Sequence, residues 1–516
     1  MSRTKQLLFA LGIIIFFGVL YHYKYINEFP SHIHAWAQAD RYALTLGFIN
    51  NNFNFFKPET FVMNPYFPHG WRVPLNESIT AVDFPAHEFI AAIVMKVSGI
   101  RSPWILRLYI LLYSFVGLIG LFKLSNLLTG SFAKSIFVVI FTATSPVFVY
   151  YQGGFLPSIP SFSNAIIGIY FYTRYLHNSR DRDYYFAVFF LTLAALSRIS
   201  FSIPLIAMMA LEFIRIIQKQ TRLKPKLLPG ILSVSIILAY FFYNSYLKNK
   251  YGSIFLSEIR PANNFGHVKE IFNIIYNNWF YHYFSIIHYY IFGIITVIAL
   301  ITVKFWIKKI KQITGQFWIL TTIIILGSTI LFFLMINQYR VHDYYFFDTF
   351  LLPVVMSLIF LLSLIQIKSS KRNSILGTLA VLIISIPMII EANGMQSSRR
   401  IVWDGNRSNA MIENYQGSDV FLDSIGVPKD AKMLVLGAYA PNIPGILMDR
   451  KTYLIMHFNK NYIYEALLWD FDFIVTENEF FIADFSPFDP ENTFNISKVA
   501  DNGRITVWEY VETDVN

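Results

Sequence analysis

A carboxylate lies just beyond the first apolar segment of this chain. The apolar run Leu7–Leu20 is followed by the sequence His34-Ala-Trp-Ala-Gln-Ala-Asp-Arg41, which opens a polar, aromatic segment. A carboxylate at the boundary between lipid and water is placed to act as a general base, which removes a proton from a reacting group. Asp40 is therefore the first candidate catalytic residue. The alternative is that Asp40 only pairs with a cation in a solvated loop.

The residues around this acid have helical spacing. The stretch Ala35–Phe48 is predicted to be a helix. Because residues four apart share a helix face, Trp36 lies beside Asp40, and His34 lies beside Gln38. Such a helix could lie on the membrane surface with its aromatic side toward the lipid.

A second acid, Asp83, comes just before a predicted helix, Pro85–Val97. Its alternative role is to cap the N-terminus of that helix. Several polar or basic residues between the two acids could meet an anionic ligand, and each is weak evidence alone. They are Lys57, Asn64, His69 and Arg72.

A later segment, Asn337–Tyr345, combines cations with tyrosines. Arg340 and His342 are flanked there by Tyr339 and Tyr345. This combination suits a lipid phosphate, which Arg and protonated His hold by charge-assisted hydrogen bonds. The alternative is a belt of interfacial tyrosines with an arginine that reaches toward water.

Arg198 interrupts the long apolar stretch Tyr184–Ile217. A single helix over this stretch would be roughly 50 Å long, whereas the bilayer core is about 30 Å thick. The sequence therefore predicts two short helices with Arg198 at their outer turn. An ionisable residue at membrane depth is a functional candidate by default, and the alternative is that it only reaches the interface.

The composition is that of a polytopic membrane protein. Of 516 residues, 55% are hydrophobic and 14% charged, and the mean hydropathy is +0.46. A soluble protein has about 25% charged residues. The net charge of +10 comes from basic residues in short loops, which indicates membrane topology rather than nucleic-acid binding. Disulfides are excluded because there is no cysteine, and motifs for nucleotide, serine or zinc chemistry are not found.

Hydropathy predicts about eleven transmembrane helices. The first is expected to be an uncleaved anchor rather than a signal peptide, since no cleavage site follows it. The predicted spans are about 7–25, 104–122, 135–150, 162–177, 184–197, 200–217, 228–247, 284–303, 316–336, 346–367 and 374–391.

Charge asymmetry predicts the orientation of these spans. With the N-terminus inside, the inner loops carry nearly all the basic residues, as the positive-inside rule requires. These are Lys123, Lys134, Arg174, Arg180, Arg182, Lys219, Arg222, Lys224, Lys226, Lys304, Lys308, Lys309, Lys311, Lys368, Lys371 and Arg372. The short outer loops contain little that is basic beyond Arg198 and Arg340.

Three long outer segments follow from this topology. They are a first outer loop at about 22–103, a second segment at 248–282 and a soluble tail. Residues 272–279 of the second could form an amphipathic interfacial helix. We therefore predict a transmembrane domain over 1–391 and a small α/β domain over 392–516. Its expected strands are 430–437, 471–476 and 504–511, with a helix at 462–469.

The pattern as a whole resembles the GT-C glycosyltransferases. The branch it resembles contains bacterial relatives of protein O-mannosyltransferases and of the lipid A aminoarabinose transferase, and the chain is similar to glycosyltransferase family 39. The run 34–41 is similar to their acidic motif in the first outer loop. Asp83-Phe-Pro85 is similar to their Glu-x-Pro element, with Asp replacing Glu, and His342-Asp-Tyr-Tyr345 resembles their His-x-Tyr-Tyr patch. The resemblance covers roughly residues 1–390.

The resemblance implies transfer of a sugar from a polyprenyl-phosphate donor to a glycolipid, polysaccharide or protein at the periplasmic face of the bacterial inner membrane. A phosphate leaves without a general acid, so one base suffices, and we expect Asp40 to be that base with inversion at the anomeric carbon. Charge on the departing phosphate would be met by some of Arg41, Arg198, Arg340 and His342. The predicted substrate-binding residues are His34, Gln38, Arg41, Lys57, Asp83, Arg198, Tyr339, Arg340, His342 and Tyr345.

The resemblance also implies action without a cofactor. A divalent metal held by the oxygens of Asp40 and Asp83 is the less favoured alternative. Two other functions remain open. A transporter or flippase for a lipid-linked sugar would favour internal repeats and broken or charged helices at mid-membrane, and an O-antigen ligase or polymerase would keep its key basic residues in a late outer loop.

Overall fold

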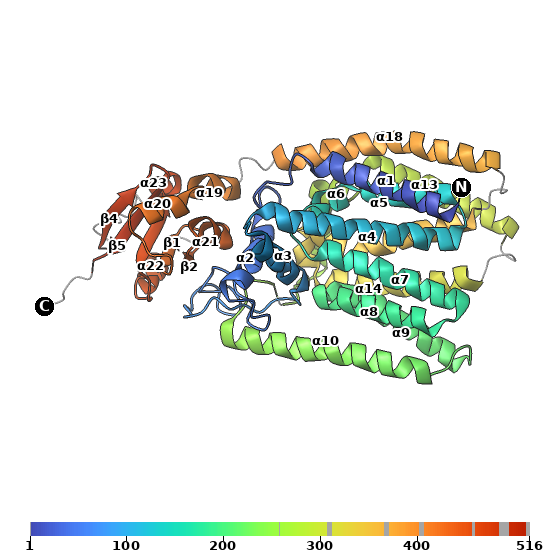
Figure 1. The fold of residues 1–516 in the computed structure, drawn as a ribbon, viewed down its shortest axis with the longest axis horizontal. Coiled ribbons are helices and arrows are strands. Elements are labelled where there is room, and N and C mark those ends of the chain that lie inside the picture. The colour runs from blue at the N-terminus through green and yellow to red at the C-terminus, as the bar shows by residue number, and fades with distance from the viewer. Residues whose placement is uncertain are drawn as a thin grey trace. The chain divides into compact units, whose positions relative to one another are not determined.

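A computed structural model describes residues 2–256, 258–306, 312–365, 371–401, 407–456, 460–484 and 495–511 (Figure 1). Contacts between residues divide the chain into two compact units. The helical unit consists of Met1–Ile26, Arg107–Phe241 and Glu258–Ser398. The head unit consists of Asn27–Leu106, Phe242–Ser257 and Arg399–Asn516. The tail predicted as a domain over 392–516 thus shares a compact unit with most of the first outer segment.

Helices occupy every predicted span, and the long ones run roughly alongside one another in the helical unit (Figure 1). They are α1 (Arg3–His22), α4 (Pro103–Thr129), α5 (Phe132–Ala143), α6 (Pro146–Gln152), α7 (Ser158–Asn178), α8 (Asp181–Ser197), α9 (Ser202–Ile217), α10 (Lys224–Tyr251), α13 (Ile286–Trp306), α14 (Gln312–Leu334), α17 (Leu352–Leu364) and α18 (Lys371–Ile401). Within the described ranges, eight helices are long and apolar enough to cross a membrane, or nine if a bent pair counts as one span.

The bent pair is α5 and α6, which the sequence predicted as one span at 135–150. The two helices meet at an angle of 72°. Pro146 stands in the first turn of α6, and a proline both lacks an amide hydrogen and disfavours helix in the residue before it. A straight helix is therefore interrupted at this point.

The predicted break in Tyr184–Ile217 is confirmed. Helix α8 ends at Ser197, a 3₁₀ turn covers Ile199–Phe201, and α9 begins at Ser202. Arg198 has extended backbone angles between the two helices. Several basic residues of the charge pattern lie outside the described residues, namely Lys308, Lys309, Lys311 and Lys368.

Two shorter helical segments complete this unit. Helix α11 (Phe265–Ile274) continues as a π-helix, η2 (Ile275–Trp279), and a short α12 (Phe280–Tyr283). The segment 272–279 is thus helical, as predicted. Helices α15 (Ile336–Tyr339) and α16 (Tyr344–Phe346) precede a second π-helix, η4 (Phe347–Leu351), which leads into α17.

The head unit contains both helices predicted after the first span, α2 (Ala35–Asn50) and α3 (Ala86–Ser98), and a five-stranded sheet of order β2-β1-β3-β5-β4. Strand β1 is parallel to β2 and β3, whereas β5 is antiparallel to β3 and β4. The strands are β1 (Lys432–Leu436), β2 (Lys451–Ile455), β3 (Phe473–Glu477), β4 (Ile496–Asp501) and β5 (Ile505–Tyr510). The helices are α19 (Arg407–Tyr415), α20 (Ser418–Ser424), α21 (Asn442–Met448), α22 (Lys460–Ala466) and α23 (Asn478–Asp484).

The first outer segment is bonded to the tail sheet at the edge strand β2. The backbone amide of Met63 donates to the carbonyl of Thr452, and the Thr452 amide donates to the carbonyl of Phe61, both at 2.8 Å. Further along, Phe67 and Ser253 exchange two backbone hydrogen bonds at 2.9 Å. The segments that follow α1, α10 and α18 in the chain therefore assemble into one unit.

Candidate functional site

Helix α2 carries the residues that the sequence pointed to first. It begins at Ala35 after His34, whose φ of +56° is left-handed. The Gln38 side chain donates to the carbonyl of Ile33 at 3.0 Å, so it helps to close the first turn. Asp40 and Arg41 follow in the same helix, and each is only 3% exposed. Burial of two adjacent charged residues requires partners for both.

Asp40 has its partner in the tail. The Asn442 Nδ2 atom donates a hydrogen bond to Asp40 Oδ1 at 2.7 Å. Burial raises the pKa of the Asp40 carboxyl to about 7, while Asn442, the charge of Arg41 and a hydrogen bond from Trp36 act in the opposite direction. A carboxyl group with this pKa changes its protonation state near neutral pH, which is the condition that general-base catalysis favours.

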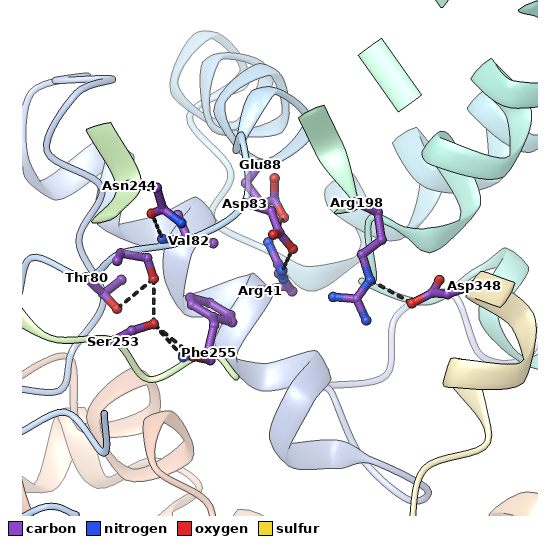
Figure 2. Close-up of polar contacts among 11 residues, drawn as sticks. Arg41, Thr80, Val82, Asp83, Glu88, Arg198, Asn244, Ser253, Phe255 and Asp348 are labelled. Carbon is purple, nitrogen blue, oxygen red and sulfur yellow. Dashed lines mark hydrogen bonds and ion pairs between the residues drawn. The ribbon is translucent and has the colours of Figure 1, made fainter. Parts of the chain in front are cut away.

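Arg41 is held by two acids and a ring (Figure 2). Its guanidinium forms ion pairs with Glu88 Oε1 at 3.2 Å and Asp83 Oδ2 at 3.3 Å. The same group lies over the Phe255 ring, 4.5 Å from its centroid. Glu88 is buried, and this desolvation raises the pKa of its carboxyl. The structure thus brings together two predicted residues, Arg41 and Asp83, and adds Glu88, which the sequence reasoning missed.

Asp83 lies two residues before the N-cap position of helix α3. Helix α3 begins after Pro85, which occupies the N-cap position and has no side-chain hydrogen bond there. The Asp83 carboxylate forms an ion pair with Arg41. An arginine between two carboxylates orients both of them. Its charge also lowers the free-energy cost of removing these carboxylates from water.

Lys57 lies away from Asp40. Its side chain is exposed, and its backbone carbonyl accepts a hydrogen bond from Asn51 at 2.6 Å, just past the C-terminus of α2. The ten residues from Asp40 to Asn50 span about 15 Å of helix. The structure does not bring the Lys57 and Asp40 side chains together.

The helical unit contains a second group, centred on Arg198. Its Nε atom forms an ion pair with Asp348 Oδ2 at 2.7 Å (Figure 2), and its guanidinium lies 5.6 Å from the Tyr344 ring centroid. Asp348 is buried in η4. Sequence reasoning missed this acid, although an ionisable residue within the predicted span 346–367 was a signal for it.

The predicted tyrosine-rich segment lies in the same unit and is well packed. The buried Tyr339 hydroxyl donates to Thr349 Oγ1 at 2.6 Å. The His342 ring stacks on Tyr344, with centroids 5.1 Å apart, and lies 6.0 Å from Tyr345. The Arg340 side chain, by contrast, is exposed. This segment therefore presents one exposed cation beside a stack of aromatic rings.

Comparisons with known proteins agree with this architecture. The family model for dolichyl-phosphate-mannose-protein mannosyltransferase matches residues 82–245. ArnT from Cupriavidus metallidurans bound to undecaprenyl phosphate superposes with a TM-score of 0.56, at 9% identity, over 99% of each chain. The chain has the GT-C fold. The resemblance predicted from the sequence is thereby confirmed.

Further matches extend the same conclusion. ArnT from the same organism in the apo state gives a TM-score of 0.57, at 9% identity, over 99% of each chain. The arabinofuranosyltransferase AftD from Mycobacteria gives 0.56 at 11% identity, covering all of this chain and 40% of that one. No curated protein sequence matches the chain significantly. The GT-C match to ArnT includes the tail, whereas the sequence resemblance ended near residue 390.

A protein site for a divalent metal requires several ligand side chains to converge on one point. Over the described ranges, no group of three or more His, Cys, Asp or Glu side chains is arranged to hold a metal ion. The two acids considered for that role are engaged differently, since Asp40 accepts from Asn442 and Asp83 pairs with Arg41.

Proposed function

We propose that this protein is an inverting membrane glycosyltransferase that uses a polyprenyl-phosphate sugar as donor. The acceptor would be a glycolipid, polysaccharide or protein at the periplasmic face of a bacterial inner membrane. The observation that carries the proposal is the buried Asp40 carboxyl, whose pKa is about 7 in a chain with the GT-C fold. The undecaprenyl phosphate in the ArnT structure supports a polyprenyl-phosphate partner.

The proposed reaction needs one proton acceptor. Asp40 removes the proton from the acceptor nucleophile as the nucleophile forms a bond to the anomeric carbon and the bond to the phosphate oxygen breaks. The phosphate leaves as a stable anion and needs no protonation, so a second carboxylic acid is not required. Attack opposite the leaving group inverts the anomeric carbon. General-base assistance of this kind is typically worth about 10²–10⁴ in rate.

We assign the basic residues separate roles. Arg340, with its exposed side chain, and His342 are proposed to bind the donor phosphate. Arg198 is proposed to stabilise charge on the departing phosphate in an orientation that Asp348 sets. We do not assign Arg41 to the donor phosphate, because its guanidinium forms ion pairs with Asp83 and Glu88. We propose no cofactor and no metal for this chemistry.

The assembly of the head unit supports the predicted topology. Its three segments follow α1, α10 and α18, which are the first, seventh and eleventh predicted spans. Segments that fold into one compact unit must lie on one side of a membrane, and odd-numbered spans end on the same side. By the positive-inside rule, the basic residues of the other loops favour an orientation in which that side lies outside the cytoplasm.

A donor-turnover assay tests the proposal. Purified protein would be given radiolabelled polyprenyl-phosphate sugars and a membrane extract as acceptor, and wild type would be compared with Asp40→Asn. We expect the variant to bind donor normally and to lose nearly all turnover. A transporter would move the donor across vesicle bilayers without consuming it, and a ligase without a base at this position would keep its turnover in the variant.

A further inference from the structure

We propose that Asn442, a residue of the C-terminal tail, is a positioning residue for the catalytic base Asp40. This inference rests on the proposed function. It makes the tail a component of the catalytic site.

The orientation of the Asn442 amide follows from its second hydrogen bond. The backbone N–H of Phe61 points to Asn442 Oδ1 at 3.1 Å. A backbone N–H can only donate, so the atom facing it must be the carbonyl oxygen of the amide. The NH₂ group therefore faces Asp40, to which it donates at 2.7 Å. An N–H donor stabilises a carboxylate more than a carboxylic acid.

The location of Asn442 is fixed by the packing of the tail. It is the first residue of α21, directly after Pro441, and its side chain is fully buried. Helix α21 packs closely on the first outer segment. The approach is so close that a Cβ added at Gly445 would lie 2.5 Å from Phe61 Cβ. Strand β2 bonds the same segment through Thr452. The amide is thus held from both sides and cannot easily turn away from Asp40.

The surroundings of Asp40 explain why such a donor matters. Arg41 is the charged residue that acts on the Asp40 carboxyl, and Asp83 and Glu88 offset much of the Arg41 charge. Trp36 and Asn442 are its hydrogen-bond donors. In a desolvated site each donor counts for more than in water. Asn442 therefore has two effects, which are to hold the Asp40 side chain in one rotamer and to favour its ionised form.

Three variants test this role, with the pH profile of kcat/KM as the readout. Asn442→Ala removes the hydrogen-bond donor to Asp40, and we expect kcat to fall about tenfold or more while the KM for the sugar donor is unchanged. The acid limb, which is the part of the profile where the rate rises with pH, should move to higher pH. Asn442→Asp keeps the shape and the acceptor for Phe61 but places a carboxylate against Asp40. Its acid limb should move further upward, since two adjacent carboxylates resist ionising together.

Asn409→Ala is the matched control. Asn409 is also a buried tail residue that accepts a backbone N–H from the first outer segment, in this case that of His32 at 3.0 Å. A general loosening of the tail would lower activity in both variants without moving the acid limb. We expect the limb to move only in the Asn442 variants.

The outcomes separate this inference from the proposed function. Turnover retained in Asp40→Asn would overturn the proposed function itself. Turnover lost in Asp40→Asn, but with wild-type kcat and acid limb in folded Asn442→Ala, would overturn only the positioning role. If Asn442→Ala does not fold, the nearly isosteric Asn442→Asp decides the question, and an unshifted acid limb there would reject the inference.

Discussion

Asn442 Nδ2 lies 2.7 Å from Asp40 Oδ1, although the two residues are 402 positions apart in the chain. One belongs to the tail and the other to the first helix after the first span. The environment of the carboxyl group is therefore assembled from two segments that are far apart in the sequence. This relationship makes the protonation of Asp40 sensitive to changes in the tail.

The first prediction concerns the pH dependence of stability. The folded-state pKa of Asp40 is raised to about 7 from an ordinary value of 3.8, so the folded state binds this proton more tightly than the unfolded state. The stability that this provides is present at low pH and is lost as the pH rises from about 4 to about 7. Asp40→Asn cannot ionise, so its melting temperature should exceed that of wild type more at about pH 9 than at about pH 5.5.

Calorimetry or a fluorescence melt in detergent at both pH values measures this difference. At high pH, ionisation of Asp40 can lower the free energy of unfolding of the wild type by at most roughly 4 kcal/mol, which corresponds to a pKa difference of about three units. A difference in melting temperature that does not change with pH would contradict the raised pKa.

The second prediction concerns the buried ion pair of Arg41. Replacing it with Met leaves Glu88 buried without its cation, and removal of one partner of a buried pair typically costs about 3–5 kcal/mol. We expect a large loss of thermal stability in Arg41→Met. The double variant Arg41→Met/Glu88→Gln should recover part of this stability, because the fully buried Glu88 carboxylate that lost its cation is then replaced by a neutral amide.

A surface pair provides the control for this experiment. Lys498 and Asp501 form an ion pair at 2.7 Å on the tail sheet, with the lysine side chain half exposed. Lys498→Met should change the free energy of unfolding by less than about 1 kcal/mol. Equal effects of the Arg41 and Lys498 substitutions would show that the Arg41 pair is not desolvated.

The third prediction concerns the packing of α2. A Cβ added at Gly47 would lie 1.9 Å from the carbonyl oxygen of Glu59. Backbone atoms cannot yield as a flexible side chain does, so Gly47→Ala should destabilise the protein by about 1–3 kcal/mol or more. Gly394 is also helical but has open space around it, and Gly394→Ala should be neutral or slightly stabilising. Melting temperatures of the two variants would be compared, and a neutral Gly47→Ala would refute the close approach.

The fourth prediction concerns topology. Because the chain has no cysteine, each single substitution introduces one thiol that a membrane-impermeant maleimide can report. Exposed positions are Glu77 in the first outer segment, Asp430 in the tail and Lys219 after α9. In intact cells, Glu77→Cys and Asp430→Cys should be labelled, and Lys219→Cys should be labelled only after the membrane is permeabilised. The reverse labelling pattern would show that the orientation in the membrane is opposite to the one proposed.

Much of the architecture could be predicted because it depends on local pattern. Apolar runs located the long helices, and the spacing around Asp40 predicted α2. The buried strands β1, β3 and β5 were also predicted, whereas β2 and β4 were not. Strand β4 lies at the edge of the sheet with mostly exposed side chains, so its sequence lacks the apolar run that marks a buried strand.

The partners of the charged residues could not be predicted in the same way. Glu88 is 47 positions from Arg41, and Asp348 is 150 positions from Arg198. Which acid meets which cation depends on tertiary packing, and a single sequence contains no signal of that pairing. The contact of Asn442 with Asp40 also depends on tertiary packing. In addition, asparagine is common in the loops that follow buried strands, so its presence there gave no signal.

The most direct test of the account is the pH dependence of kcat/KM for sugar transfer from a polyprenyl-phosphate donor. With Asp40 as the base, activity requires its ionised form, so the rate should rise with pH and reach half its maximum near the carboxyl pKa of about 7. Asp40→Asn should lose this limb together with about 10²–10⁴ of the rate. An acid limb that is identical in wild type and Asp40→Asn, with comparable turnover, would contradict the account.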